Sequence, residues 1–115
     1  MDNLKIGKTG EDIVADYLRK QGFIVLRQNF KGRFGEIDVI AESETHIIFV
    51  EVKTRTGIKF ATGREAVDRS KQNRIKATAA DFLSKFPMEL QPRFDVAEIT
   101  ATEAGRTFKY FKDAF

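Results

Sequence analysis

The stretch FGEIDVIAESETHIIFVEVKTR, residues 34–55, decides the fold. Two apolar runs, residues 36–41 and 46–54, flank the short polar sequence SET, which is typical of a β-hairpin. Charged residues interrupt both runs, with Asp38 in the first and Glu51 and Lys53 in the second. Because charges in core strands are costly to desolvate, these three residues require an explanation.

The alternation of side chains along a strand suggests how these charges are arranged. The run 46–54 is apolar on both faces as far as residue 50, which predicts a central strand covered on both sides. Glu51 and Lys53 then share one face near its end, about 7 Å apart. If Glu36, Asp38 and Ile40 share the matching face of the neighbouring strand, Asp38 and Glu51 converge.

Further elements surround this hairpin. The sequence predicts a helix over 9–22, a strand over 23–30, a turn over 31–35, a loop over 55–63, a helix over 64–86, and strands over 93–100 and 107–112, the last at a sheet edge. Thr9 and Asp12 resemble a capping box, and Gly22 is a suitable helix stop. The apolar stripe of the second helix consists of Val67, Ile75, Ala79, Phe82 and Phe86.

The order αβββαββ predicts an α/β fold, with a mixed central β-sheet of about five strands flanked by helices. A chain of 115 residues suits a single domain, residues 1–115, and 42% apolar residues with eleven Phe can form its core. Most of the Phe residues belong to that core; Phe34, Phe60 and Phe115 are candidates for exposure.

Composition limits the possible chemistry. The absence of Cys excludes disulfides, thiolate metal sites and cysteine nucleophiles. There is no signal-peptide pattern and no apolar run near 18 residues, so we expect a soluble, cytoplasmic protein with no membrane partner. The net charge of +3 is weak support for a nucleic-acid partner, and stronger if several carboxylates are clustered in a metal site.

Two close carboxylates repel each other unless one is protonated or a cation lies between them. Mg²⁺ suits such a pair because it takes oxygen ligands and keeps positions for water and substrate phosphate. A lysine beside them could orient or deprotonate a water, or hold the scissile phosphate. Asp38, Glu51 and Lys53 therefore match what phosphodiester hydrolysis requires.

Asp38, then twelve residues, then Glu51-Val52-Lys53 resembles the D…(D/E)-x-K signature of the restriction-endonuclease-like, or PD-(D/E)XK, nucleases. The segments GEID and FVEVKTR, with REAVDRSKQNRIKATAADFL, RFDVAEI and FKDAF, resemble the small YraN-type family over nearly the whole chain. That family is usually linked by fold to Holliday-junction resolvases. The resemblance implies a restriction-endonuclease-like core.

The resemblance also implies roles for individual residues. Asp38 and Glu51 would be carboxylate ligands of Mg²⁺ or Mn²⁺, with the Val52 backbone carbonyl completing the inner shell. Lys53 would be the catalytic lysine. Glu11 corresponds to a helix carboxylate that lies beside the metal in resolvase-like members. A homodimer would suit a two-fold substrate such as a four-way junction.

Each of these residues also has a structural interpretation. Asp38, Glu51 and Lys53 could form a structural ion pair at a sheet end. Glu11 could simply stabilise its helix, because a negative charge near the N-terminus interacts favourably with the helix dipole. Glu36, which belongs to GEID, has no settled role and could end a strand.

Basic residues have the same two interpretations. Lys71 could reach a phosphate or the carboxylates, or could extend to solvent. Arg55 follows Lys53 on the same side and could contact phosphate of the nucleic acid, or lie exposed in the loop. Arg27, Lys31 and Arg33 are expected to form a basic patch beside the site that contacts nucleic acid. His46 stands at the hairpin turn and is not expected to act as a base.

The leading hypothesis is a Mg²⁺-dependent endonuclease, a hydrolase that cleaves structured or branched DNA. A non-catalytic nucleic-acid-binding module with the same fold is the second hypothesis. A protein-interaction subunit is the third.

Overall fold

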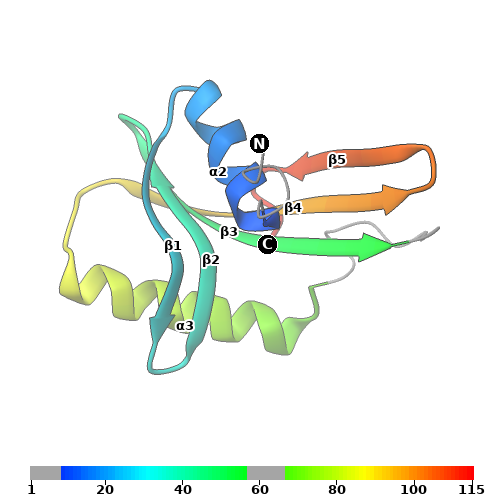
Figure 1. The fold of residues 1–115 in the computed structure, drawn as a ribbon. Helices are drawn as coiled ribbons and strands as arrows, with labels where there is room; N and C mark the ends of the chain where they lie inside the picture. Colours follow the sequence, from blue (N-terminus) through cyan, green and yellow to red (C-terminus); the bar gives the residue numbers. More distant parts are fainter. Residues whose placement is uncertain (1–8, 57–66) are drawn as a thin grey trace.

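The computed structural model describes residues 9–56 and 67–115, which form a five-stranded mixed sheet with a helix against each face (Figure 1). The elements are α2 (Gly10–Lys20), β1 (Ile24–Gly32), β2 (Gly35–Glu42), β3 (His46–Thr56), α3 (Arg69–Lys85), β4 (Gln91–Thr102) and β5 (Gly105–Phe111). The predicted α/β class and the order αβββαββ are confirmed.

The strands lie in sequence order, β1-β2-β3-β4-β5, so β3 is central as predicted and β5 is an edge. β1, β2 and β3 form an antiparallel meander, and β4 pairs with β5 in the same antiparallel way. β3 and β4 run parallel, which requires a crossover connection between them. The segment containing α3 supplies that crossover. Of the predicted loop over 55–63, residues 55 and 56 belong to β3, and residues 57–63 lie outside the described part of the chain.

Helix α2 begins with the predicted capping box. The Thr9 side chain accepts a hydrogen bond from the Asp12 N–H at 3.2 Å, and the Asp12 carboxylate accepts one from the Thr9 N–H at 3.1 Å. These two bonds satisfy amide donors that the first turn of a helix leaves unpaired. Gly22 follows the helix with φ 96°, a conformation that favours glycine.

Helix α3 begins later than the sequence suggested. Asp68 is its N-cap, with extended backbone and a side chain that accepts a 2.8 Å hydrogen bond from the Lys71 N–H. Residues 67 and 68 are therefore not helical, and predicted residues 64–66 lie outside the described part of the chain. The predicted burial of Phe86 is wrong, because its side chain is 40% exposed beyond the last helical turn.

Two apolar cores cover the two faces of the sheet. The α3-side core contains Ile37, Ile40, Ile47, Phe49, Ile75, Ala79, Phe82 and Val96 together with Val67 and Ala114. The α2-side core contains Val14, Leu18, Val39, Ala41, Ile48, Val50, Ala97 and Ile99. Alternate residues of β3 belong to opposite cores, as its alternation predicted.

Strand β2 departs from that regularity at Asp38. Ile37 and Ile40 both pack in the α3-side core, whereas strict alternation would place residues three apart on opposite faces. Asn29, on the neighbouring strand β1 between the pairs made by Gln28 and Phe30, has φ 56°. Both strands are therefore irregular near Asp38. The expectation that Glu36, Asp38 and Ile40 share one face by regular alternation does not hold.

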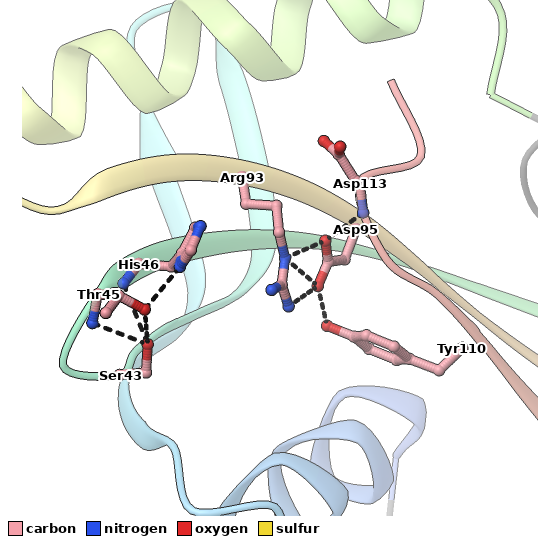
Figure 2. A network of polar contacts seen from close by, with 7 residues as sticks. All are labelled: Ser43, Thr45, His46, Arg93, Asp95, Tyr110 and Asp113. Atoms are coloured by element: carbon pink, nitrogen blue, oxygen red, sulfur yellow. Dashed lines mark hydrogen bonds and ion pairs between the residues drawn. The ribbon is translucent and has the colours of Figure 1, made fainter.

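A polar network fastens the C-terminal segment to β4 (Figure 2). The fully buried Asp95 carboxylate accepts hydrogen bonds from the Arg93 guanidinium, from the Tyr110 hydroxyl at 2.6 Å and from the Asp113 N–H at 2.8 Å. Desolvation and the Asp95 charge raise the pKa of Tyr110 well above its usual value, so this phenol stays protonated and keeps donating.

Neither helix in the described part of the chain is long and apolar enough to cross a membrane.

Candidate metal and phosphate site

The site lies where β2 and β3 separate. Their last paired residues are Val39 and Val50, and continuing the same register would put Asp38 opposite Glu51. Instead of a further backbone pair, Asp38 Oδ2 accepts a 2.7 Å hydrogen bond from the Val52 N–H. A strand residue that bonds across a ladder directs its N–H and C=O to the same side. The Val52 carbonyl therefore also faces β2.

Glu51 projects from β3 toward α3. Its side chain is 6% exposed, and Oε2 lies 3.2 Å from Nζ of Lys71 and 3.8 Å from Nζ of Lys53. The two lysines come from different elements, so the first turn of α3 and the end of β3 supply cations to one carboxylate. The ammonium groups keep partial access to solvent, since the Lys53 and Lys71 side chains are 29% and 37% exposed.

Burial raises the pKa of Asp38 to about 7, although the hydrogen bond from Val52 N–H opposes the shift. The charges of Glu51, Glu11 and Glu36 are smaller contributions to this same rise. All three carboxylates are thus close enough to Asp38 for like-charge repulsion to count. A cation bound here would relieve that repulsion.

Glu11 reaches this cluster from the start of α2, on the opposite side of the sheet. Gly10 makes the approach possible, because a Cβ there would lie 2.9 Å from Thr54 Oγ1 and 3.2 Å from Val52 Cγ1. The first turn of α2 therefore packs directly against the end of β3. Glu11 also lies in the first turn of α2, where the helix dipole stabilises a negative charge. A purely structural role in stabilising the helix therefore fits Glu11 as well.

Glu98 is a nearly buried carboxylate that the sequence reasoning missed. It lies on β4 beside Lys53 in the parallel register, and Oε2 is 3.1 Å from Nε of Arg55 without hydrogen-bond geometry. Its signal was present in RFDVAEI, a second apolar run interrupted by acidic residues. The parallel register that brings Glu98 beside Lys53 is a long-range pairing, which one sequence does not reveal.

The predicted basic patch is divided in the structure. The Arg27 guanidinium lies 4.8 Å from the centre of the Phe86 ring, at the C-terminal end of α3. Lys31 pairs in register with Glu36, and Arg33 occupies the hairpin tip. In register, Arg27 lies opposite Ile40 and Lys31 opposite Glu36, each two residues from Asp38, whereas Arg33 lies farther away at the tip.

His46 opens β3, and its Nδ1 is 2.8 Å from Thr45 Oγ1 (Figure 2). It stands at the opposite end of the strand from Lys53. Its contact is with the turn that joins β2 to β3, in keeping with the expectation that it is not a base.

The donor groups suit a hard cation. No cluster of three or more His, Cys, Asp or Glu side chains in residues 9–56 and 67–115 has the arrangement of a metal site. Mg²⁺, however, often binds through only one or two carboxylates, with waters and substrate oxygens completing its octahedron. Asp38, Glu51 and the Val52 carbonyl are three oxygen donors of that kind.

The comparison with known proteins places the chain in a family. Residues 10–99 match the model of "Uncharacterised protein family UPF0102". The chain belongs to the UPF0102 family. This confirms the resemblance to the YraN-type proteins, and the matched UPF0102 region contains every proposed site residue from Glu11 to Glu98.

Relatives named UPF0102 protein match over almost their whole length. The one from Dictyoglomus thermophilum is 44% identical, with 100% of both chains covered. The one from Syntrophotalea carbinolica is 41% identical over 97% of this chain and 92% of its own. The one from Caldicellulosiruptor bescii is 42% identical over 98% of this chain and 99% of its own.

Proposed function

We propose that this UPF0102 protein is a Mg²⁺-dependent nuclease that hydrolyses phosphodiester bonds in structured or branched DNA. The observation that carries the proposal is the pair of nearly buried carboxylates, Asp38 and Glu51, at the point where two strands separate, with two lysine ammonium groups within 4 Å of Glu51. A purely structural ion pair needs one cation and one anion, whereas this site gathers several of each.

Asp38, Glu51 and the Val52 carbonyl would hold Mg²⁺ or Mn²⁺, with Glu11 supporting the site from α2. When bound, the metal would supply an activated water and neutralise charge on the phosphate oxygens. Asp38 is held in place for this role by its hydrogen bond to the Val52 N–H.

Lys53 and Lys71 have complementary roles in the proposal. Lys53, 3.8 Å from Glu51, would orient the attacking water by donating a hydrogen bond to it. Lys71, 3.2 Å from the same oxygen, would contact the scissile phosphate once the carboxylate is shared with a cation. Each ammonium would stabilise the negative charge that develops at phosphorus.

The start of α3 supports a polyanionic substrate. Its first turn contains no acidic residue after the Asp68 cap, and Arg69 and Lys71 stand there instead. Cations near a helix N-terminus oppose the helix dipole, so this arrangement lowers helix stability. A bound phosphate would compensate for that loss.

A non-catalytic nucleic-acid-binding module is the second candidate. The observation that favours it is the pairing of Glu51 with both lysines, which neutralises this carboxylate without a metal. This candidate predicts salt-dependent binding that needs no divalent cation.

The test is a cleavage panel with purified full-length protein. Linear duplex, single-stranded, flap and four-way-junction DNA and a structured RNA are each incubated with Mg²⁺, Mn²⁺ or EDTA. Asp38→Asn and Lys53→Ala are compared with Glu44→Gln, an exposed carboxylate in the turn between β2 and β3. Metal-dependent cleavage that only the first two variants lose supports the nuclease. Metal-independent binding without any cleavage supports the binding module, and no binding to any nucleic acid would favour a protein-interaction subunit.

A further inference from the structure

Phe34 is an exposed aromatic ring at the tip of the β1–β2 hairpin, four residues from Asp38. Its side chain is 51% exposed and belongs to neither core. Gly32 and Gly35 are the last paired residues, so the turn itself consists of Arg33 and Phe34. Two-residue hairpin turns favour Asn, Asp and Gly, so turn formation does not explain the phenylalanine.

The tip is braced against α3, which it crosses in Figure 1. A Cβ at Gly32 would lie 2.7 Å from Asp81 Oδ2 and 3.3 Å from Thr78 Cγ2, so the hairpin backbone approaches the helix very closely. The Arg33 N–H donates to the same Asp81 oxygen at 3.3 Å. The tip is therefore held in one position, and a contact made by Phe34 would lose little entropy on binding.

The charges around the ring match a nucleic acid. The Arg33 guanidinium lies 5.3 Å from the centre of the Phe34 ring, and Lys31 is a second exposed cation on the same hairpin. Proteins that bind single strands combine such cations, which contact the phosphates, with aromatic rings on which bases stack. Glu36 is the carboxylate on this part of the hairpin, and it is paired in register with Lys31.

We propose that Phe34 stacks on an unpaired base of the substrate. This inference rests on the proposed function and narrows its substrate class to DNA with unpaired bases near the scissile phosphate, as at a duplex–single-strand junction. The four residues from Phe34 to Asp38 span about 13 Å of strand. At about 3.4 Å per nucleotide step, the stacked base lies a few nucleotides from the cleaved bond.

The chain contains no Trp, so Phe34→Trp introduces a single tryptophan, at the tip, whose emission can be excited apart from that of the two Tyr. Its emission is titrated in EDTA, which separates binding from cleavage, with a blunt duplex and with the same duplex carrying a single-stranded extension. We expect strong quenching by the extended duplex and little by the blunt one. Phe34→Ala should weaken binding of the extended duplex by about 5- to 150-fold, the range for one base–aromatic stack, and leave the blunt duplex almost unchanged.

Ile24→Ala is the matched control, because Ile24 is an exposed apolar residue of the same hairpin at the far end of β1, 61% exposed. It should change neither affinity. Unchanged Trp emission at saturating DNA would overturn the inference. An emission change that depends on protein concentration in the absence of DNA would also overturn the inference, because it would show that the tip contacts a second copy of the protein.

The inference and the proposed function can fail separately. Quenching by unpaired bases without cleavage of any substrate would retain the stacking role of Phe34 and reject the nuclease. If wild type and Phe34→Ala cleave all substrates with equal activity, the proposed nuclease function is retained and the stacking role of Phe34 is rejected.

Discussion

The carboxylate of Asp38 accepts a 2.7 Å hydrogen bond from the backbone N–H of Val52 on the neighbouring strand. A side chain thus replaces the backbone acceptor that a longer ladder between β2 and β3 would have provided. The consequence is a carboxylate with a fixed position and little solvent, at the point where the two strands part.

Without metal, the stability of the protein should depend on pH through Asp38. Its pKa is raised from 3.8 to about 7 in the folded state, so folding favours the protonated carboxyl. That contribution is fully present below about pH 4 and is lost as pH rises through 7. In EDTA, urea unfolding should show wild type losing about 4 kcal/mol at most relative to Asp38→Asn over this range. A constant difference between the two proteins would contradict the shift.

Divalent cations should stabilise the folded protein if Asp38 and Glu51 bind them. At neutral pH, Mg²⁺ at about 100 times its Kd would add roughly 2.7 kcal/mol, measured as a rise in the thermal midpoint. Asp38→Asn and Glu51→Gln should lose this rise, whereas the exposed Glu44→Gln should keep it. Equal rises in all four proteins would indicate binding elsewhere.

Lys53 and Lys71 should affect different kinetic steps of the proposed nuclease. Lys53→Ala should lower kcat by about 10²-fold or more, because it removes a cation beside the attacking water. Lys71→Ala should chiefly raise KM, because the residue is assigned to the substrate phosphate and is partly exposed. Single-turnover cleavage at varied substrate concentration separates the two, and Lys85→Ala, at the far end of α3, is the control. An identical kcat loss in both lysine variants would contradict the division of roles.

The Asp95 network should be essential to stability and independent of the site. Asp95→Ala would leave the partly buried Arg93 without its carboxylate, at a loss of at most about 3–5 kcal/mol in the free energy of unfolding. Tyr110→Phe, which removes one hydrogen bond and keeps the ring, should lose about 1–3 kcal/mol. Denaturant titration measures both. An Asp95→Ala variant as stable as wild type would mean that the network is dispensable.

Local patterns were sufficient to predict most of the fold. Alternation over residues 46–54 predicted a central strand, because both faces of β3 are covered by apolar cores. The spacing of Thr9 and Asp12 predicted the start of α2, because a capping box depends only on residues three apart. Asp38 and Glu51 were found in the same way, as charges in apolar runs.

The errors came from features that depend on more distant residues. The irregular course of β2 at Asp38 involves Asn29 on another strand, and the proximity of Glu98 to Lys53 depends on a parallel register. Arg27 is close in sequence to Arg33, but Arg27 packs on the Phe86 ring whereas Arg33 lies at the hairpin tip beside Asp81. The late start of α3 was a missed local signal, since Asp68 was available as a cap.

The anchoring of the C-terminal segment bears on when the protein can fold during its synthesis. Asp95 obtains two of its hydrogen-bond partners from residues 110 and 113. While these residues are still inside the ribosomal tunnel, the Asp95 carboxylate of the nascent β4 has only the Arg93 guanidinium as a hydrogen-bond partner. Asp95 is therefore fully paired only after residues 110–113 have left the tunnel, and a chain stalled before Tyr110 would lack this anchor between β4 and the segment after it.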